Sequence, residues 1–164
     1  MYVESVNATG RYGVKCLDAN GNIKWEDEID NLVVTVGKAN LLNVYLASST
    51  QTTTWYLGLV SGATSPTYAD ADTISSHAGW TESTAYSNAT RPQAVFGTPT
   101  STNSISSSQA TFNINATATI AGAFLVNDNT KGGTTGTLYS AGSFATSRSV
   151  ILGDSLLVTY TASA

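Results

Sequence analysis

The amino-acid sequence predicts a mainly β protein: a single-domain β-sandwich over residues 1–164, jelly-roll-like in topology, with one short α-helix near residues 38–47. Three observations predict this fold. Ser and Thr make up 45 of the 164 residues; both compete with a helix backbone for hydrogen bonds, and Thr fits a pleated sheet. Short apolar or alternating runs are separated by Gly, Asn and Asp, which is typical of strands and turns. A single segment has the apolar spacing of a helix.

The first element is a charged β-hairpin over residues 12–29. Two stretches that alternate between apolar and polar residues flank an Asn20-Gly21 turn. Nine of the 18 charged residues lie within the first 30 positions of the chain. We interpret the hairpin as an edge ribbon that its charges protect against aggregation, with docking of a partner as the alternative. Trp25 and Glu26 are the residues predicted to contact such a partner.

A strand at residues 32–36, a helix at residues 38–47 and a central strand at residues 55–60 follow the hairpin. The run Leu-Val-Val-Thr-Val favours the first strand, and Gly37 is expected to end it. The helix is predicted because its apolar residues recur at spacings that place them on one broad face. The continuous apolar run at residues 55–60 has the length of a strand that is buried on both faces of a sheet.

Residues 61–84 form a long segment with little regular patterning. In a compact domain, a segment of this kind usually has a function or crosses the surface. It is therefore the second predicted contact surface, and its candidate contact residues are Asp70, Asp72, His77 and Trp80.

The last third of the chain is almost entirely β in character. Gly, Asn and Asp separate its apolar and alternating stretches. The strands predicted here lie at residues 110–120, 121–126, 137–141, 150–152 and 156–161.

Charge and hydropathy argue against two kinds of partner. The formal net charge is −4 and the basic residues are scattered, whereas nucleic-acid binding needs a clustered basic face. The longest apolar stretches are far shorter than the roughly 20 residues of a membrane-spanning helix. The N-terminus lacks the pattern of a secretory signal, so we expect the chain to be made and used without signal-dependent export. Neither nucleic acid nor a membrane is expected to be a partner.

The residues that usually carry catalysis or hold metals are scarce. Cys16 is the single cysteine, so it cannot form an internal disulfide, and we interpret it as a small packed hydrophobe. His77 is the single histidine, and no Gly-x-Ser-x-Gly motif accompanies it. One Cys and one His do not provide a transition-metal site, and the Asp-rich segment lacks the Gly and the distal Glu of a calcium loop. No metal and no cofactor is predicted.

Two further enzymatic patterns also fail. Glu82 with Asp70 or Asp72 is the plausible carboxylate pair for sugar hydrolysis outside the hairpin, but nothing in the sequence marks these residues as a pair. Lys131 precedes its glycines, whereas in a phosphate-binding loop the lysine follows them. We interpret this Gly-rich segment as a wide β-turn, and we predict that the protein is not an enzyme.

Carbohydrate binding is an alternative, because aromatic rings on a β-sandwich can form a platform for sugars. Trp25, Trp55, Trp80 and Tyr86 are the candidates, and Trp80 is the best of them. The competing interpretation is that Trp80 anchors its loop to the core.

Several groups of residues carry a resemblance to known proteins. They are Val34-Thr-Val-Gly-Lys-Ala-Asn-Leu-Leu, Trp55-Tyr-Leu-Gly-Leu-Val, His77-x-Gly79-Trp80-x-Glu82-x-x-x-Tyr86-x-x-x-x-Arg91-Pro92, Ala121-Gly-Ala-Phe-Leu-Val, Lys131-Gly-Gly-Thr-Thr-Gly-Thr-Leu-Tyr-Ser and Gly153-Asp-x-Leu-x-Val-x-Tyr160. From about Asn31 to the C-terminus, the chain resembles small β-rich virion structural proteins of tailed bacteriophages. These motifs consist of framework glycines and apolar core positions, so they indicate a fold more than a catalytic role.

The resemblance implies a capsid decoration, or cement, protein that binds the outer surface of the major capsid shell and stabilises it. The implied partners are the major capsid protein and copies of the chain itself, as a homodimer or homotrimer on the capsid. The implied location is the capsid surface of the virion, after synthesis in the cytoplasm of the bacterial host. A tail or fibre-associated protein for host adsorption is the first alternative, and a carbohydrate-binding module is the second.

Overall fold

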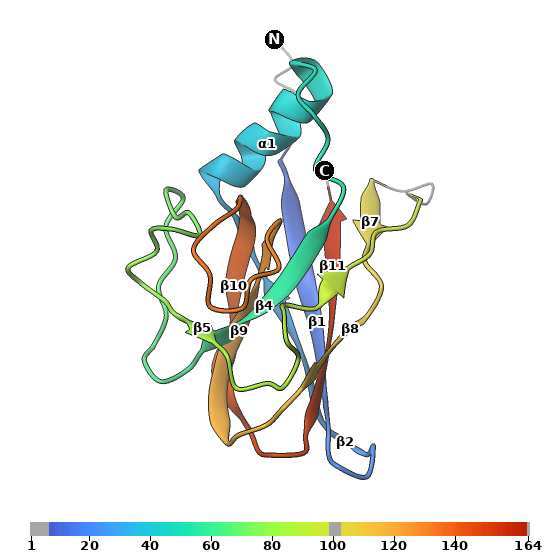
Figure 1. The fold of residues 1–164 in the computed structure, drawn as a ribbon, viewed down its shortest axis with the longest axis vertical. Helices are drawn as coiled ribbons and strands as arrows, with labels where there is room; N and C mark the ends of the chain where they lie inside the picture. The colour runs from blue at the N-terminus through green and yellow to red at the C-terminus, as the bar shows by residue number, and fades with distance from the viewer. Residues whose placement is uncertain (1–6, 99–102, 164) are drawn as a thin grey trace.

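The computed structural model describes residues 7–98 and 103–163 and arranges them in two antiparallel sheets, with a helix at one end (Figure 1). The predicted mainly β sandwich with one short helix is thereby confirmed. In chain order the elements are β1 (Thr9–Leu17), β2 (Ile23–Asp30), β3 (Leu32–Val33), α1 (Thr35–Leu46), β4 (Trp55–Ser61), β5 (Glu82–Ser83), β6 (Gln93–Ala94), β7 (Ser104–Ser106), β8 (Ala110–Asn113), β9 (Ala118–Val126), β10 (Leu138–Val150) and β11 (Ser155–Ser163).

The first sheet has the strand order β2-β1-β11-β7, and β8 also pairs with β11. The predicted hairpin is present, because β1 and β2 pair antiparallel with Lys15 opposite Glu26. In its turn, Gly21 has a φ of +82°, a conformation that glycine adopts without steric cost. The Asp18 carboxylate accepts the backbone N–H groups of Asn20 and Asn22 at 2.8 and 2.9 Å, which fixes the turn.

The second sheet has the order β3-β10-β9-β4-β5, and β6 also pairs with β4. Its strands differ from the prediction in two places. The predicted strands at residues 137–141 and 150–152 are replaced by one strand, β10, which pairs with β9 over residues 138–143 and 148–150 with an irregularity between them, and residues 151–152 lie beyond its end. The alternating run at residues 110–120 is divided between β8, which pairs in the first sheet, and the beginning of β9 in the second.

The helix α1 begins at Thr35 and ends at Leu46, so the prediction of a helix at residues 38–47 placed its start three residues too late. The predicted strand at residues 32–36 is correspondingly shortened to Leu32–Val33. Gly37 lies inside the helix instead of breaking it. A Cβ atom at Gly37 would lie 2.3 Å from the Tyr139 carbonyl oxygen, so glycine permits the close approach of α1 to β10.

A hydrophobic core fills the space between the two sheets. Alternate residues of β1 and β11 point into it, and the rings of Tyr12 and Tyr160 meet there with their centroids 4.7 Å apart. The buried Tyr12 hydroxyl is satisfied by the Ser140 hydroxyl at 2.6 Å and donates to the Ser140 carbonyl at 3.0 Å. Each buried large apolar side chain contributes about 1.5–3 kcal/mol relative to an exposed one.

A second core covers the opposite face of the second sheet. Ile74 and Trp80 of residues 62–81, which we call the covering segment, pack there against Phe124 and Val126 of β9. The neighbouring β9 residue Leu125 points into the first core. The second sheet is therefore buried on both faces, as the apolar run at residues 55–60 predicted for its central strand.

The jelly-roll part of the fold prediction is not confirmed. The consecutive strands β1 and β2 form a hairpin in the first sheet, and the consecutive strands β9 and β10 form a hairpin in the second sheet. The strand order defines a two-sheet antiparallel sandwich, and we describe the protein in those terms.

Candidate functional site

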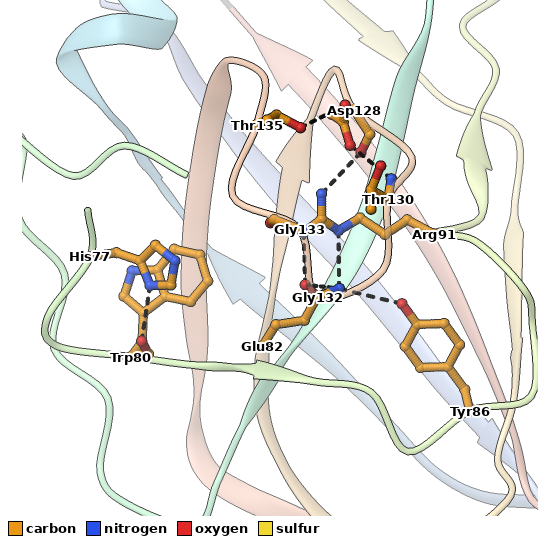
Figure 2. Close-up of polar contacts among 10 residues, drawn as sticks. All are labelled: His77, Trp80, Glu82, Tyr86, Arg91, Asp128, Thr130, Gly132, Gly133 and Thr135. Carbon is orange, nitrogen blue, oxygen red and sulfur yellow. Dashed lines mark hydrogen bonds and ion pairs between the residues drawn. The ribbon is translucent and has the colours of Figure 1, made fainter. Parts of the chain in front are cut away.

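The strand β5, the segment that leads from it to β6, and the loop that joins β9 to β10 meet around a buried ion pair between Glu82 and Arg91 (Figure 2). Arg91 Nε donates to Glu82 Oε1 at 3.0 Å, and Arg91 Nη2 donates to Glu82 Oε2 at 2.7 Å. The Arg91 side chain is 0% exposed and that of Glu82 is 9% exposed. This two-pronged geometry is among the strongest arrangements of an ion pair in proteins.

The same two side chains also fasten the β9–β10 loop. Arg91 donates to the carbonyl oxygens of Asp128 at 3.0 Å and Gly133 at 2.8 Å. Glu82 Oε2 accepts the backbone N–H of Gly132 at 2.9 Å. The guanidinium lies over the Phe124 ring, 5.2 Å from its centroid. We call Glu82 and Arg91 with their loop partners the clamp.

The β9–β10 loop has its own internal support. The Asp128 carboxylate accepts the Thr130 backbone N–H at 2.8 Å and the Thr135 hydroxyl at 3.0 Å. The hydrogen bonds from Thr130, followed by the one from Thr135, lower the pKa of Asp128. Gly132 and Gly136 have φ values of +72° and +98°, so the Gly-rich segment serves as a connection between strands.

Tyr86 and Lys131 extend the clamp on one side. The Tyr86 hydroxyl donates to Glu82 Oε1 at 3.4 Å, and burial, followed by the Glu82 charge, raises the pKa of Tyr86. Lys131 Nζ donates to the carbonyl oxygens of Tyr86 at 2.9 Å and Asn88 at 2.8 Å. This ammonium also lies 4.7 Å from the centroid of the Tyr86 ring. The Lys131 charge is therefore used inside the protein.

Asp72, His77 and Trp80 of the predicted contact set lie together within the covering segment. Trp80 is only 3% exposed, and its indole N–H donates to Asp72 Oδ2 at 3.1 Å. The His77 ring stacks on the Trp80 ring at 3.8 Å between centroids, and His77 Nδ1 contacts the Trp80 carbonyl oxygen at 2.9 Å. Trp80 thus anchors its loop to the core, and its ring is too deeply buried to form a sugar platform.

The other predicted contact residues lie elsewhere. Asp70 is exposed on the covering segment, with its carboxylate 3.6 Å from Lys38 Nζ. Glu26 forms an exposed ion pair with Lys15 at 2.7 Å.

Trp25 is half-buried on β2. Its ring packs edge-on against Phe144, with 5.6 Å between the centroids. Trp25 and Glu26 lie in β2, whereas the other four predicted residues lie in the covering segment, where Asp72 and Trp80 are buried, so the six residues do not form one contact surface.

Sequence reasoning missed an apolar surface at the end of the sandwich where α1 lies. The helix exposes four large apolar side chains, Leu41, Leu42, Tyr45 and Leu46. Beside it lies a groove of about 600 Å³ that is lined by 17 residues, none of them charged. The prediction of one broad apolar face on the helix is wrong, because its apolar residues are spread around the helix instead of forming one core-facing stripe, and this spread was the available signal.

The thiol of Cys16, the single cysteine, is buried. Burial, followed by the nearby Asp154 charge, raises the pKa of the Cys16 thiol to about 11. Among residues 7–98 and 103–163, no group of three His, Cys, Asp or Glu side chains is placed to hold a metal ion. In the same residues, no helix has the length and apolar character needed to cross a membrane.

Comparison with known proteins adds no relative to this description. No protein-family model matches the chain, and no curated protein matches its sequence significantly.

Proposed function

We propose that this chain is a non-catalytic structural protein of a tailed-bacteriophage virion, which binds the outer surface of the capsid shell and stabilises it. The sequence resemblance supplies the class of assembly. The structural observation that gives most support is the covering segment, a surface loop that is held in one conformation before any partner binds.

The covering segment is anchored at several points along its length. The side chains of Ile74 and Trp80 are buried in the second core. The Thr67 backbone N–H donates to the Gly79 carbonyl at 2.9 Å, which joins the two arms of the segment. The Tyr68 and Ser143 hydroxyls are 2.7 Å apart, which ties the segment to β10. A loop held in this way loses little conformational freedom on binding, and this favours affinity.

The covering segment exposes several small residues to solvent. Its exposed positions include Ala69, Asp70, Ala71, Ser75 and Ser76. Small side chains allow the backbone to approach a partner closely. A protein that binds the assembled shell and not the free subunits shifts the equilibrium toward the closed shell by mass action.

The interior chemistry supports a structural role over a catalytic one. Arg91, Glu82 and Lys131 are occupied by contacts within the chain, and Cys16 is buried. The carbohydrate-binding alternative is weakened because Trp80, its best platform residue, is buried.

The proposal is tested by co-sedimentation of the purified chain with shells of the encoding virus that lack it. We expect saturable binding, and a loss of binding of at least tenfold for a variant that carries both Ala71→Arg and Ser75→Arg. The matched control is Asn20→Arg, an exposed substitution in the hairpin turn, which should bind as the wild type does. If the wild-type chain stays in the supernatant at every shell concentration, the proposal is wrong.

A further inference from the structure

The end of the sandwich that carries α1 has the character of a protein interface. Tyr45 is 86% exposed and Leu46 is 73% exposed, and Leu41 and Leu42 lie beside them. Monomeric proteins rarely expose contiguous apolar patches of this kind, and such patches commonly mark interaction sites. A helix with apolar residues all round is usually buried, so a partner is expected to cover the outer side of α1.

The groove next to α1 provides the complementary surface. Leu41 and Val44 of the helix line one side, and Val95, Phe96 and Ile105 from the segments around β6 and β7 line it as well. Because no charged side chain lines it, the groove favours an uncharged apolar occupant over a charged one.

The outer side of α1 is itself an occupant of that kind. The helix carries one charged residue, Lys38, and this residue pairs with Asp70 of the covering segment. The large apolar side chains that the helix exposes are Leu41, Leu42, Tyr45 and Leu46, and the smaller Thr35, Ala39 and Asn43 are exposed beside them. Apart from Lys38, the helix and the groove therefore both lack charged side chains.

We propose that a second copy of the chain occupies this surface, with α1 of each copy lying in the groove of the other. The charge distribution favours a second copy at this end. The chain carries a formal net charge of −4, so the repulsion between two copies is smallest where they meet through uncharged surfaces and keep their charged groups far apart. The turn of the charged β1–β2 hairpin lies at the opposite end of the sandwich from α1 (Figure 1). An approach through the α1 ends keeps these turns far apart.

The adjacency of helix and groove also fits a symmetric pair. Leu41 and Val44 belong to α1 and line the groove at the same time, so the two surfaces are neighbours on one chain. In a dimer with a two-fold axis at this end, the helix of each copy lies in the groove of the other. The helix and the groove of both copies are then covered at the same time. The cores of homodimer interfaces are typically apolar and poor in charge, as this surface is.

The inference is tested on the free chain, without shells, by sedimentation equilibrium from about 1 to 100 μM. We expect the wild type to reach twice the mass of one chain. Two variants should remain at the mass of one chain: Leu42→Asp combined with Leu46→Asp on the helix, and Val95→Asp in the groove. All three positions are exposed, so circular dichroism should show an unchanged fold.

The matched control is Leu152→Asp, which changes an equally exposed leucine in the turn between β10 and β11. It should form the same dimer as the wild type. A wild-type chain that is monomeric at 100 μM would overturn the inference, and so would helix and groove variants that remain dimeric. If the monomeric wild type bound shells through Leu42, the surface would belong to the shell and not to a second copy. Sedimentation equilibrium is measured without shells. A monomeric wild type would therefore overturn the dimer inference and leave the capsid proposal to be decided by the co-sedimentation experiment.

Discussion

Arg91 and Glu82 are nine positions apart and form a two-pronged ion pair that is almost fully removed from solvent, with N–O distances of 3.0 and 2.7 Å (Figure 2). The pair joins β5 and the segment before β6 to the β9–β10 loop, since the Arg91 and Glu82 side chains also bind backbone groups of Gly133 and Gly132. The conformation of the β9–β10 loop therefore depends in part on this buried pair.

Removal of the Glu82 charge should destabilise the protein strongly. In Glu82→Gln, the side chain keeps its size but leaves the buried Arg91 cation without its anion. A broken buried pair typically costs about 3–5 kcal/mol, and we expect a loss of this size in the free energy of unfolding in urea. Trypsin should also cleave faster after Lys131, because the loop is released.

The matched control is Glu26→Gln, which breaks the ion pair with Lys15 on the exposed side of the first sheet. Exposed pairs contribute about 0–1 kcal/mol, so this variant should unfold almost as the wild type does. Equal losses for Glu82→Gln and Glu26→Gln would contradict the role assigned to the clamp.

The indole of Trp80 should contribute through both its packing and its N–H group. Trp80→Ala removes a buried aromatic side chain and should cost about 3–5 kcal/mol. Trp80→Phe keeps an aromatic ring but removes the donor to the buried Asp72 carboxylate, which should cost about 1–3 kcal/mol. Unfolding followed by circular dichroism measures both.

Trp25→Phe provides the comparison, since the buried Trp25 Nε1 has no hydrogen-bond partner. This substitution loses no hydrogen bond, so it should cost less than Trp80→Phe. The opposite order would show that the Trp80–Asp72 contact contributes little.

Alkaline pH should destabilise the protein. Burial raises the pKa of Cys16 from an ordinary value of 9.0 to about 11 and that of Tyr68 from 10.0 to about 12, and it also raises the pKa of Tyr12 and Tyr160. The unfolded chain loses these protons at lower pH than the folded chain does. Protonation of these buried groups therefore adds to the free energy of unfolding. This contribution is complete below pH 9 and is lost as the pH rises through the pKa values of the groups in the folded chain.

We expect the urea midpoint to fall steadily above pH 9, and the tyrosinate absorbance at 295 nm to rise together with unfolding. At pH 8 the folded chain should react only slowly with a thiol reagent, and denaturant should make the reaction fast. A midpoint that stays constant from pH 8 to pH 11 would be incompatible with these buried groups.

Two glycines in strands should respond oppositely to alanine. At Gly122 a Cβ atom would lie 1.9 Å from the Gly142 carbonyl oxygen of β10, and the backbone cannot yield without disturbing the strand pairing. We expect Gly122→Ala to cost about 3 kcal/mol. At Gly13 no atom lies within 4 Å of the added carbon, so Gly13→Ala should be neutral or stabilising by up to about 1 kcal/mol. The melting temperatures of the two variants, each compared with that of the wild type, test both expectations.

The sequence predicts well those elements that follow from residues close together in the chain. The β1–β2 hairpin follows from its alternation and from the Asn20-Gly21 turn. The burial of β4 on both faces follows from its apolar run. Elements with a tertiary cause were predicted less well. The strand β10 has a largely polar middle, and β9 pairs with it on both sides of that stretch. Gly37 is tolerated in α1 because the helix lies against Tyr139.

The clamp could not be derived from the sequence, because its partners come from two distant stretches of the chain. In the sequence, Glu82 and Arg91 stand out only as positions of the resemblance, and Glu82 is also a candidate catalytic carboxylate. The structure shows that Arg91 neutralises it. The sequence left two interpretations of Trp80, and only the packing of the covering segment decides between them.

The proposed role on the capsid is tested most directly by cryo-electron microscopy of particles of the virus that encodes this chain. The account predicts density for the two-sheet sandwich at many symmetry-related positions on the outer surface of the shell, with the covering segment against the shell. Density for the chain on the tail alone, or particles that lack the chain, would contradict the account.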